Sequence, residues 1–225
     1  MGAHVITANK GPLVHAYREL YTLAASRNLK FRFESATADC VPVYSLFRDA
    51  LPLAKPRRFR GLVNGTTSVI LEVIERGGSF EEGVKLAQER GVAETDPSLD
   101  VNGSDAAVKV VAIANVLMGA NLSLKDFEVV GIGDLEPAAI REAFEAGTPI
   151  RLVSSLEHDG DTFTASVKPT RLEKGDPLNG LDAMSLALSF ETNMVHGITV
   201  VGHGLDAHST AYGVLCDFIN VARGR

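Results

Sequence analysis

The chain has 225 residues, of which 45% are hydrophobic and 22% charged, values that exclude a disordered, collagen-like or low-complexity chain. The 22 basic and 28 acidic residues give a net charge of −6 without a basic cluster, so we expect no nucleic-acid partner. We also expect no membrane partner and a cytoplasmic location, because the chain has no apolar run of membrane-spanning length, no signal-peptide pattern and only two cysteines, Cys40 and Cys216.

The N-terminal residues predict an incomplete parallel layer. A β-branched run at 4–7 predicts a strand, residues 13–27 a helix and residues 29–33 a second strand. A strand, a crossover helix and a strand form the unit of a parallel sheet. Two parallel strands cannot cover their own faces, so we expect other elements to complete this layer.

The middle of the chain predicts several helices and one strand. Residues 44–54 predict a short helix, Pro56 ends it, and 59–63 predict a strand. Residues 67–75 predict an amphipathic helix, and Ser79 and Glu82 have the spacing of a capping box that opens a helix ending near residue 91. An acidic loop at 93–103 then leads into a strongly apolar helix at 104–118.

The second half predicts antiparallel strands with a few helices. Residues 123–127 and 137–145 predict helices, and 150–156, 163–167 and 185–190 predict antiparallel strands. A last strand at 198–201 is followed by a glycine turn, Gly202-His203-Gly204, and by a helix at about 209–222. We find no internal repeat.

Asp105 and Lys109 form the most informative pair in the sequence. They lie four residues apart at the start of the apolar helix, so both side chains share one face, and Asp105 sits at the positive end of the helix dipole. An isolated pair of this kind is usually a solvated ion pair. Here the neighbouring residues are so apolar that we expect Lys109 to be partly buried, where an ammonium needs a partner.

The acidic loop suggests a substrate that carries an amino group. Glu94, Asp96 and Asp100 precede the N-terminus of the same helix. Several carboxylates beside one lysine suit a small substrate whose ammonium is held by the carboxylates while Lys109 donates a proton to a developing alkoxide. Because a neighbouring carboxylate favours the protonated lysine, reduction of a carbonyl is the direction that this arrangement supports better.

Five segments, in order along the chain, carry a resemblance to homoserine dehydrogenases. They are Asn9-Lys10-Gly11-Pro12-Leu13, Phe33-Glu34-Ser35-Ala36, Asn64-Gly65-Thr66-Thr67, Ala93-Glu94-Thr95-Asp96-Pro97-Ser98-Leu99-Asp100 and Gly103-Ser104-Asp105-Ala106-Ala107-Val108-Lys109. The resemblance covers nearly the whole chain, and the acidic loop with its Asp-x-x-x-Lys helix is its most specific part.

The resemblance implies a reaction and a set of site residues. It implies reduction of aspartate 4-semialdehyde to homoserine with NADPH or NADH, on the way to threonine and methionine. By position it implies catalytic roles for Lys109 and Lys10 and substrate binding by Glu94, Asp100, Asp105, Gly65 and Thr66. It further implies cofactor contacts from Asn9, Lys10, Gly202 and Gly204. The cofactor supplies the hydride, and the protein supplies position and charge.

The nucleotide-binding fingerprint of the family is not found ahead of these segments. We therefore expect a chain that opens near the fourth strand of a Rossmann-type domain and lacks the pyrophosphate turn. The run from Gly202 to Ala207 formally satisfies Gly-x-Gly-x-x-Ala, but only 18 residues follow it, so we interpret it as a turn between a strand and a helix. The sequence leaves the choice between NADP and NAD open.

Two departures from the family pattern concern the cofactor and the substrate. Thr37-Ala38-Asp39-Cys40 stands where the family has a glycine-rich stretch, which places side chains and a negative charge near the cofactor. Some members build a site for Na⁺ or K⁺ from this loop, and Glu34 is the residue here that could supply an oxygen. Val92 stands where a tyrosine is common.

We predict an α/β fold that combines a partial Rossmann-type layer with a complete α+β substrate domain containing a mostly antiparallel sheet. The expected division is a dinucleotide-binding remnant at 1–42, a substrate-binding, catalytic and dimerisation domain at 43–200, and a turn and helix at 201–225 that return to the first unit. We expect a homodimer, because a second copy would bury an open sheet. The alternative to a dehydrogenase is a catalytically silent protein that binds homoserine or the semialdehyde without its own cofactor domain.

Overall fold

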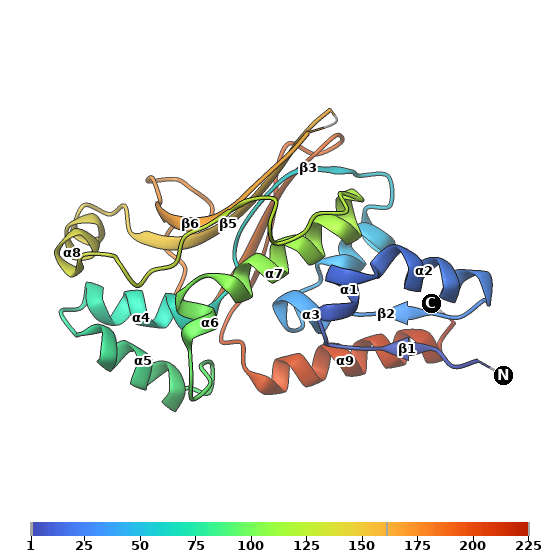
Figure 1. Ribbon diagram of the computed structural model, residues 1–225, viewed down its shortest axis with the longest axis horizontal. Coiled ribbons are helices and arrows are strands. Elements are labelled where there is room, and N and C mark those ends of the chain that lie inside the picture. The colour runs from blue at the N-terminus through green and yellow to red at the C-terminus, as the bar shows by residue number, and fades with distance from the viewer. Residues whose placement is uncertain (1, 161, 225) are drawn as a thin grey trace.

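The computed structural model describes residues 2–160 and 162–224, which form two separate sheets and the helices around them. The six-stranded sheet and its helices occupy one end of an elongated molecule (Figure 1). The two-stranded sheet lies at the other end, where the described chain begins and ends. This arrangement confirms the predicted α/β class.

The six-stranded sheet has the strand order β4-β6-β5-β3-β7-β8. Its strands are β3 (Pro56–Leu62), β4 (Glu128–Val129), β5 (Ile150–Asp159), β6 (Thr162–Arg171), β7 (Leu186–Thr192) and β8 (Ile198–Gly202). All neighbours run antiparallel except β4 and β6. In the centre, Phe59 pairs with Leu156 on one side and Phe190 on the other, and all three side chains are fully buried. The prediction of a mostly antiparallel sheet is confirmed.

Four helices accompany this sheet: α4 (Gly65–Glu75), α5 (Phe80–Glu89), α7 (Ser104–Ile113) and α8 (Pro137–Glu145). Their apolar faces place Ile70, Val110, Ile113 and Ile140 in one core with the central strands. The predicted capping box is confirmed, since the Ser79 hydroxyl accepts from the Glu82 N–H while the Glu82 carboxylate accepts from the Ser79 N–H. The helices thereby bring the starts of α4 and α7 to the same sheet.

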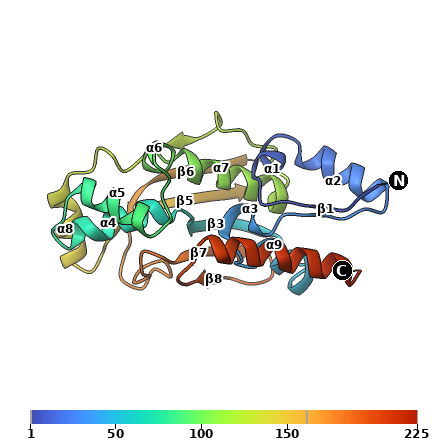
Figure 2. The same cartoon turned by 90° about the horizontal axis from the view of Figure 1, so that it is seen from below.

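The two-stranded sheet is the predicted parallel layer. Its strands are β1 (Val5–Ile6) and β2 (Phe31–Arg32), connected through α1 (Gly11–His15) and α2 (Tyr17–Ser26). The short helix α3 (Ser35–Ala38) follows β2, and α9 (Ala207–Ala222) returns from the end of the chain. Helix α9, drawn in red, runs beside β1 and α3 (Figures 1 and 2). The two predicted strands are therefore present but shorter than expected, and a helical connection joins them.

The single helix predicted for residues 13–27 is wrong, because the chain breaks at Ala16 into α1 and α2. Ala16 has φ −153° and ψ 27°, outside the helical region. The amide of Asn115 donates to the carbonyls of Leu13 and Val14 at 3.2 and 3.3 Å. In a continuous helix these carbonyls would accept from residues 17 and 18, so a side chain a hundred residues away replaces two helical hydrogen bonds.

The helix predicted at 123–127 is also wrong. The Asp126 carboxylate accepts from the N–H of Ser123 at 2.6 Å and closes a turn, after which β4 joins the sheet. Pro56 was expected only to end the preceding helix, but it is the first residue of β3. Three further elements are η1 (Leu46–Ala50) and η2 (Ala114–Met118), which are π-helical, and α6 (Ser98–Val101) inside the acidic loop.

The two ends of the molecule expose different side chains. On the face of the large sheet that points away from α4 and α7, Thr199, Ser189, Arg60, Ser155 and Ser166 form a row across five strands. Beside the small sheet, α2 and α9 expose several large apolar side chains: Leu20, Tyr21, Leu23, Tyr212, Leu215, Phe218 and Ile219. None of the helices described here is long and apolar enough to cross a membrane.

Candidate active site

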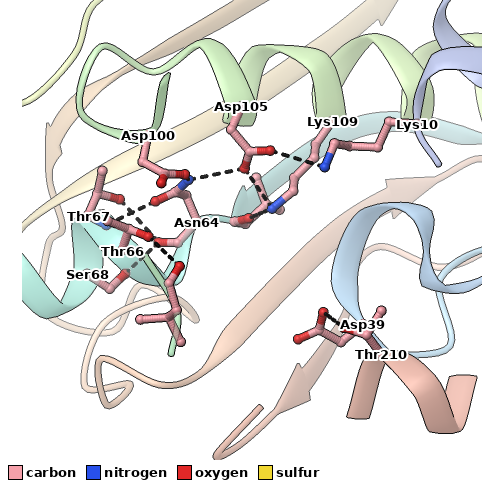
Figure 3. Close-up of polar contacts among 12 residues, drawn as sticks. Lys10, Asp39, Asn64, Thr66, Thr67, Ser68, Asp100, Asp105, Lys109 and Thr210 are labelled. Carbon is pink, nitrogen blue, oxygen red and sulfur yellow. Dashed lines mark hydrogen bonds and ion pairs between the residues drawn. The ribbon is translucent and has the colours of Figure 1, made fainter. Parts of the chain in front are cut away.

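The candidate site forms where the first turns of α4 and α7 meet. Asn64 caps α4 by accepting from the Thr67 N–H at 2.9 Å. Gly103 precedes α7 with φ +83°, a conformation that glycine adopts without strain, and this turn sets the direction of the helix. The two helix starts place Asn64, Asp100, Asp105 and Lys109 within one cluster of polar contacts (Figure 3).

Lys109 is held at two points. Its Nζ lies 2.9 Å from the Asp105 carboxylate and donates to the carbonyl oxygen of Val63 at 2.5 Å. The side chain is 14% exposed. The predicted burial and the pairing with Asp105 are therefore confirmed, whereas the carbonyl contact, which comes from the end of β3, has no signal in the sequence. The ammonium is fixed on one side and open to a cleft on the other.

Asp105 is shared by two ammonium groups. Its second oxygen lies 3.2 Å from the Nζ of Lys10, which reaches across from the start of α1 (Figure 3). Burial alone would raise the pKa of Asp105, but the charges of Lys109 and Lys10 outweigh it and lower this pKa to about 2. The carboxylate is therefore ionised throughout the physiological range, and it joins a residue of the small layer to the helix that carries Lys109.

Asn64 organises the carboxylates, a role that the sequence analysis missed. Its amide donates to Asp100 at 2.6 Å and to Asp105 at 3.1 Å. Burial raises the pKa of Asp100, the Asn64 hydrogen bond opposes that rise, and the nearby Asp105 charge adds to it. Asn64 belongs to one of the segments that carry the family resemblance, and a polar residue directly before a helix was the available signal.

A cleft of about 300 Å³ lies beside Lys109. It is lined by Asp39, Gly65, Gly91, Val92, Lys109, Met184, Leu186, Leu205, Asp206, Ala207 and Thr210. Figure 3 shows Asp39 and Thr210 across from Lys109. The Thr210 hydroxyl donates to the Asp39 carboxylate at 2.7 Å, and Asp39 has φ +52°, which is unusual for a residue with a side chain. The cleft combines one ammonium, two carboxylates and an apolar wall.

The substrate-binding residues predicted by resemblance divide into two groups. Gly65, Asp100 and Asp105 lie at the cleft or in the cluster beside it. Thr66 is buried, and its hydroxyl donates to the Val92 carbonyl at 2.8 Å, so only its backbone could face a ligand. Glu94 is exposed, and within the described residues its carboxylate makes no hydrogen bond or ion pair.

Three of the predicted cofactor residues, Asn9, Gly202 and Gly204, shape the local backbone. The Asn9 side chain accepts from the Gly11 N–H at 2.9 Å and so helps to form the start of α1. A Cβ on Gly202 would lie 2.6 Å from Val41, so this glycine allows close packing. Gly204 has φ +60°. Neither glycine lines the cleft; the three residues that follow Gly204 do.

The Glu34 carboxylate is held by backbone N–H groups. This buried carboxylate accepts from the N–H groups of Val43, Tyr44 and Ser45 at 2.6 to 2.7 Å. Three N–H donors occupy three of the roughly four lone-pair positions of this carboxylate. Across residues 2–160 and 162–224, no group of three or more His, Cys, Asp or Glu side chains could hold a metal ion. Glu34 therefore fixes the turn into η1, and the expected Na⁺ or K⁺ site at this residue stays a prediction.

Comparison with known proteins gives a consistent family. The family model for homoserine dehydrogenase matches residues 42–219. A homoserine dehydrogenase of Methanocaldococcus jannaschii is 37% identical over 97% of this chain and 64% of its own length. A second from Sulfurisphaera tokodaii is 36% identical over 99% and 68%. A protein of Pseudomonas canavaninivorans named NAD(+)-dependent homoserine dehydrogenase is 35% identical over 98% and 63%.

Solved structures agree with these relatives. The homoserine dehydrogenase of Thermoplasma acidophilum superposes with a TM-score of 0.85 at 27% identity, covering 98% of this chain and 66% of that structure. A hyperthermophilic archaeal homoserine dehydrogenase in complex with NADPH gives a TM-score of 0.83 at 28% identity, covering 99% and 65%. The chain thus spans about two thirds of the length of the relatives that it matches.

Proposed function

The chain belongs to the homoserine dehydrogenase family, and from that membership we propose that it reduces aspartate 4-semialdehyde to homoserine with a nicotinamide cofactor. The observation that carries the proposal is the ammonium of Lys109, which Asp105 and the Val63 carbonyl hold at the edge of a cleft. A fixed ammonium of this kind can protonate an alkoxide as it forms. The reaction class places the chain in threonine and methionine biosynthesis.

The cluster offers separate contacts for the two ends of an amino-acid aldehyde. The N-terminus of α4 at Gly65 and Thr66 carries positive dipole charge and suits the substrate carboxylate. Asp105 already neutralises two lysines, whereas Asp100 forms no ion pair within the described residues, so Asp100 is the better partner for the substrate ammonium. Glu94 stands close in sequence and is free to add a second contact. The aldehyde oxygen then lies at Lys109.

The proton step follows from the way in which Lys109 is held. A bound nicotinamide cofactor supplies the hydride that the carbonyl carbon receives. The carbonyl oxygen becomes an alkoxide and takes a proton from the Lys109 Nζ, which gives the alcohol and a neutral amine. Asp105 keeps its other partner, Lys10, during this step. Lys10 is 34% exposed, so the cluster remains in contact with water, from which Lys109 regains its proton.

The cleft fits the ring end of such a cofactor. Met184, Leu186 and Leu205 give one wall that a flat, largely apolar ring can contact. Lys10 stands where the chain leaves β1, at the side of the cluster that faces the small layer. The first N–H groups of α9 are already satisfied by Asp206, so this helix start is not the phosphate site. We assign Asn9, Lys10, Gly202 and Gly204 to the cofactor side of the site as a proposal, with NADP and NAD both allowed.

Turnover of the semialdehyde tests the proposal. The assay follows the loss of NADPH or NADH absorbance with aspartate 4-semialdehyde, for the wild type and for Lys109→Met, which keeps an unbranched apolar stem. We expect kcat to fall by about 10²- to 10⁴-fold, the usual contribution of a positioned acid. Lys85→Met, an exposed lysine of α5, is the matched control. Wild-type activity in Lys109→Met would refute the assignment, and binding of homoserine without any turnover would favour the silent alternative.

Two further expectations concern assembly and location. The hydroxyl-rich row through Arg60 is an open sheet face that a second copy could cover, so we propose a homodimer. Sedimentation equilibrium tests this: a monomer across the micromolar range would contradict it. Cys40 and Cys216 are free thiols, which agrees with the proposed cytoplasmic location.

A further inference from the structure

Arg32 is a nearly buried cation of the small layer. It lies on β2 and is 7% exposed. Within the described residues its guanidinium donates no hydrogen bond and joins no ion pair, and its Nε is fully shielded. Arginine offers five N–H donors, and a buried donor left unpaired is costly. The described residues leave the Nε without a partner, and the two terminal nitrogens, which are not fully shielded, are available to a ligand.

Arg32 borders a second cavity, of about 270 Å³. Six of its thirteen lining residues are aromatic: Tyr17, Tyr21, Phe31, Phe33, Tyr44 and Phe47. Two more cationic residues, Arg48 and Lys55, complete the rim together with Ala54, Pro56, Val116 and Leu117. None of these residues lines the cleft beside Lys109. The molecule therefore holds a separate pocket with flat apolar walls and a cationic end.

Arg32 is the guanidinium of this pocket that has no ion-pair partner within the described residues. Arg48 is already paired with Asp49 at 2.9 Å, and the Asp217 carboxylate accepts from the Glu34 N–H at 2.8 Å. Burial and the nearby Arg48 lower the pKa of Arg32, while Asp217 and Asp49 oppose this shift. An anion bound to Arg32 would supply the direct contact that its charged form lacks.

We propose that this cavity binds a small carboxylate with a flat apolar body. The guanidinium fork of Arg32 matches the two oxygens of a carboxylate. Aromatic walls contact a planar ring by stacking or edge-to-face packing, which a bare inorganic ion cannot exploit. The cavity volume admits a single ring with a short side chain. The pocket is a binding site independent of the dehydrogenase reaction.

Calorimetric titration with three probes tests the chemistry of the pocket. Benzoate carries both features, benzyl alcohol only the ring and inorganic phosphate only the charge. We expect benzoate to bind at least tenfold more tightly than either of the others. No heat with benzoate at 10 mM would overturn the proposal. Equal binding of benzyl alcohol, or equal binding of phosphate, would overturn it as well, because the first removes the need for Arg32 and the second the need for the aromatic walls.

Variants locate the binding. Arg32→Gln should raise the benzoate Kd at least tenfold, and Arg48→Gln, a change on the partly exposed rim that keeps the proposal testable if Arg32→Gln does not fold, at least threefold. Arg58→Gln, on the exposed face of the large sheet, is the matched control and should leave the Kd unchanged. Lys109→Met should also leave it unchanged, which separates failure of this site from failure of the proposed reaction. Unaltered binding in both Arg32→Gln and Arg48→Gln would overturn the assignment.

Discussion

The centre of the six-stranded sheet is fully buried on its helix-facing side, whereas the helices beside the two-stranded sheet leave large apolar side chains in water. Phe59, Leu156 and Phe190 have no exposed surface, but Leu23 on α2 is 49% exposed and Phe218 on α9 is 59% exposed. The small layer has a smaller buried cluster that includes Ala112 of α7, and polar contacts from single side chains such as Glu34 add to it. Apolar burial is therefore more extensive in the large region, and the small layer depends more on specific polar contacts.

The strongest test of this contrast compares two phenylalanines. Phe190→Ala removes a fully buried ring and should lower the free energy of unfolding by about 3–5 kcal/mol. Phe218→Ala removes an exposed ring and should cost less than about 1 kcal/mol. Urea denaturation followed by circular dichroism measures both. Similar costs for the two variants would contradict the contrast.

Replacing the buried carboxylate of Glu34 should destabilise the turn that follows α3, because three backbone N–H groups donate to this carboxylate. Glu34→Gln leaves an amide N–H₂ facing backbone N–H donors, so we expect a loss of about 2–3 kcal/mol in the free energy of unfolding. Glu145→Gln, at the exposed end of α8, is the matched control. A cost below about 0.5 kcal/mol for Glu34→Gln would show that these hydrogen bonds do not hold the layer.

The pH dependence of stability should report the Asp105 cluster. The pKa of Asp105 is lowered to about 2 in the folded chain, below its unfolded value near 4. A lowered carboxyl pKa stabilises the fold above the unfolded value, and this contribution of about 2 kcal/mol is lost as the pH falls from 4 through 2. The free energy of unfolding of Asp105→Asn should therefore fall less steeply between pH 4 and 2 than that of the wild type. Identical slopes for wild type and variant between pH 4 and 2 would exclude the cluster as its source.

The smallest expected effect concerns the contact between the two regions. The pair of Lys10 and Asp105 is partly exposed, so Lys10→Met should change the free energy of unfolding by less than about 1 kcal/mol. A double-mutant cycle with Asp105→Asn measures the coupling directly. A coupling above about 3 kcal/mol would mean that this ion pair is a structural contact between the layers and not mainly a feature of the site.

The site could be predicted from sequence only where its partners are neighbours in the chain. The spacing of Asp105 and Lys109 gave their pairing, because four residues on a helix fix the distance. The Val63 carbonyl lies 46 residues from Lys109 in the chain and Lys10 lies 95 residues from Asp105, and only the family resemblance placed Lys10 nearby. The sequence places Asn64 in a motif but does not predict its hydrogen bonds to the carboxylates of Asp100 and Asp105.

The elements of the fold were likewise predictable only where neighbouring residues determine them. Strands such as β5 and β7 and the capping box of α5 were predictable because their patterns are local. The break at Ala16 depends on Asn115, and the turn at 123–126 depends on a single carboxylate that competes with helix formation. Helix propensity does not predict either effect, since each depends on hydrogen bonds made by one side chain.

Helix α7 contacts α1 and α3 on one side and β5 and β6 on the other, and it carries Lys109 in its second turn. Because most of its buried residues belong to the large core and Ala112 packs with the small layer, loosening of the small layer alone would leave most of α7 intact. Amide hydrogen exchange should therefore fall into two tiers, with slow exchange in α7 and the central strands and faster exchange in β1, α2 and α9. Lys109 would then lie on a slowly exchanging helix, while β1, α2 and α9 open locally without disturbing it.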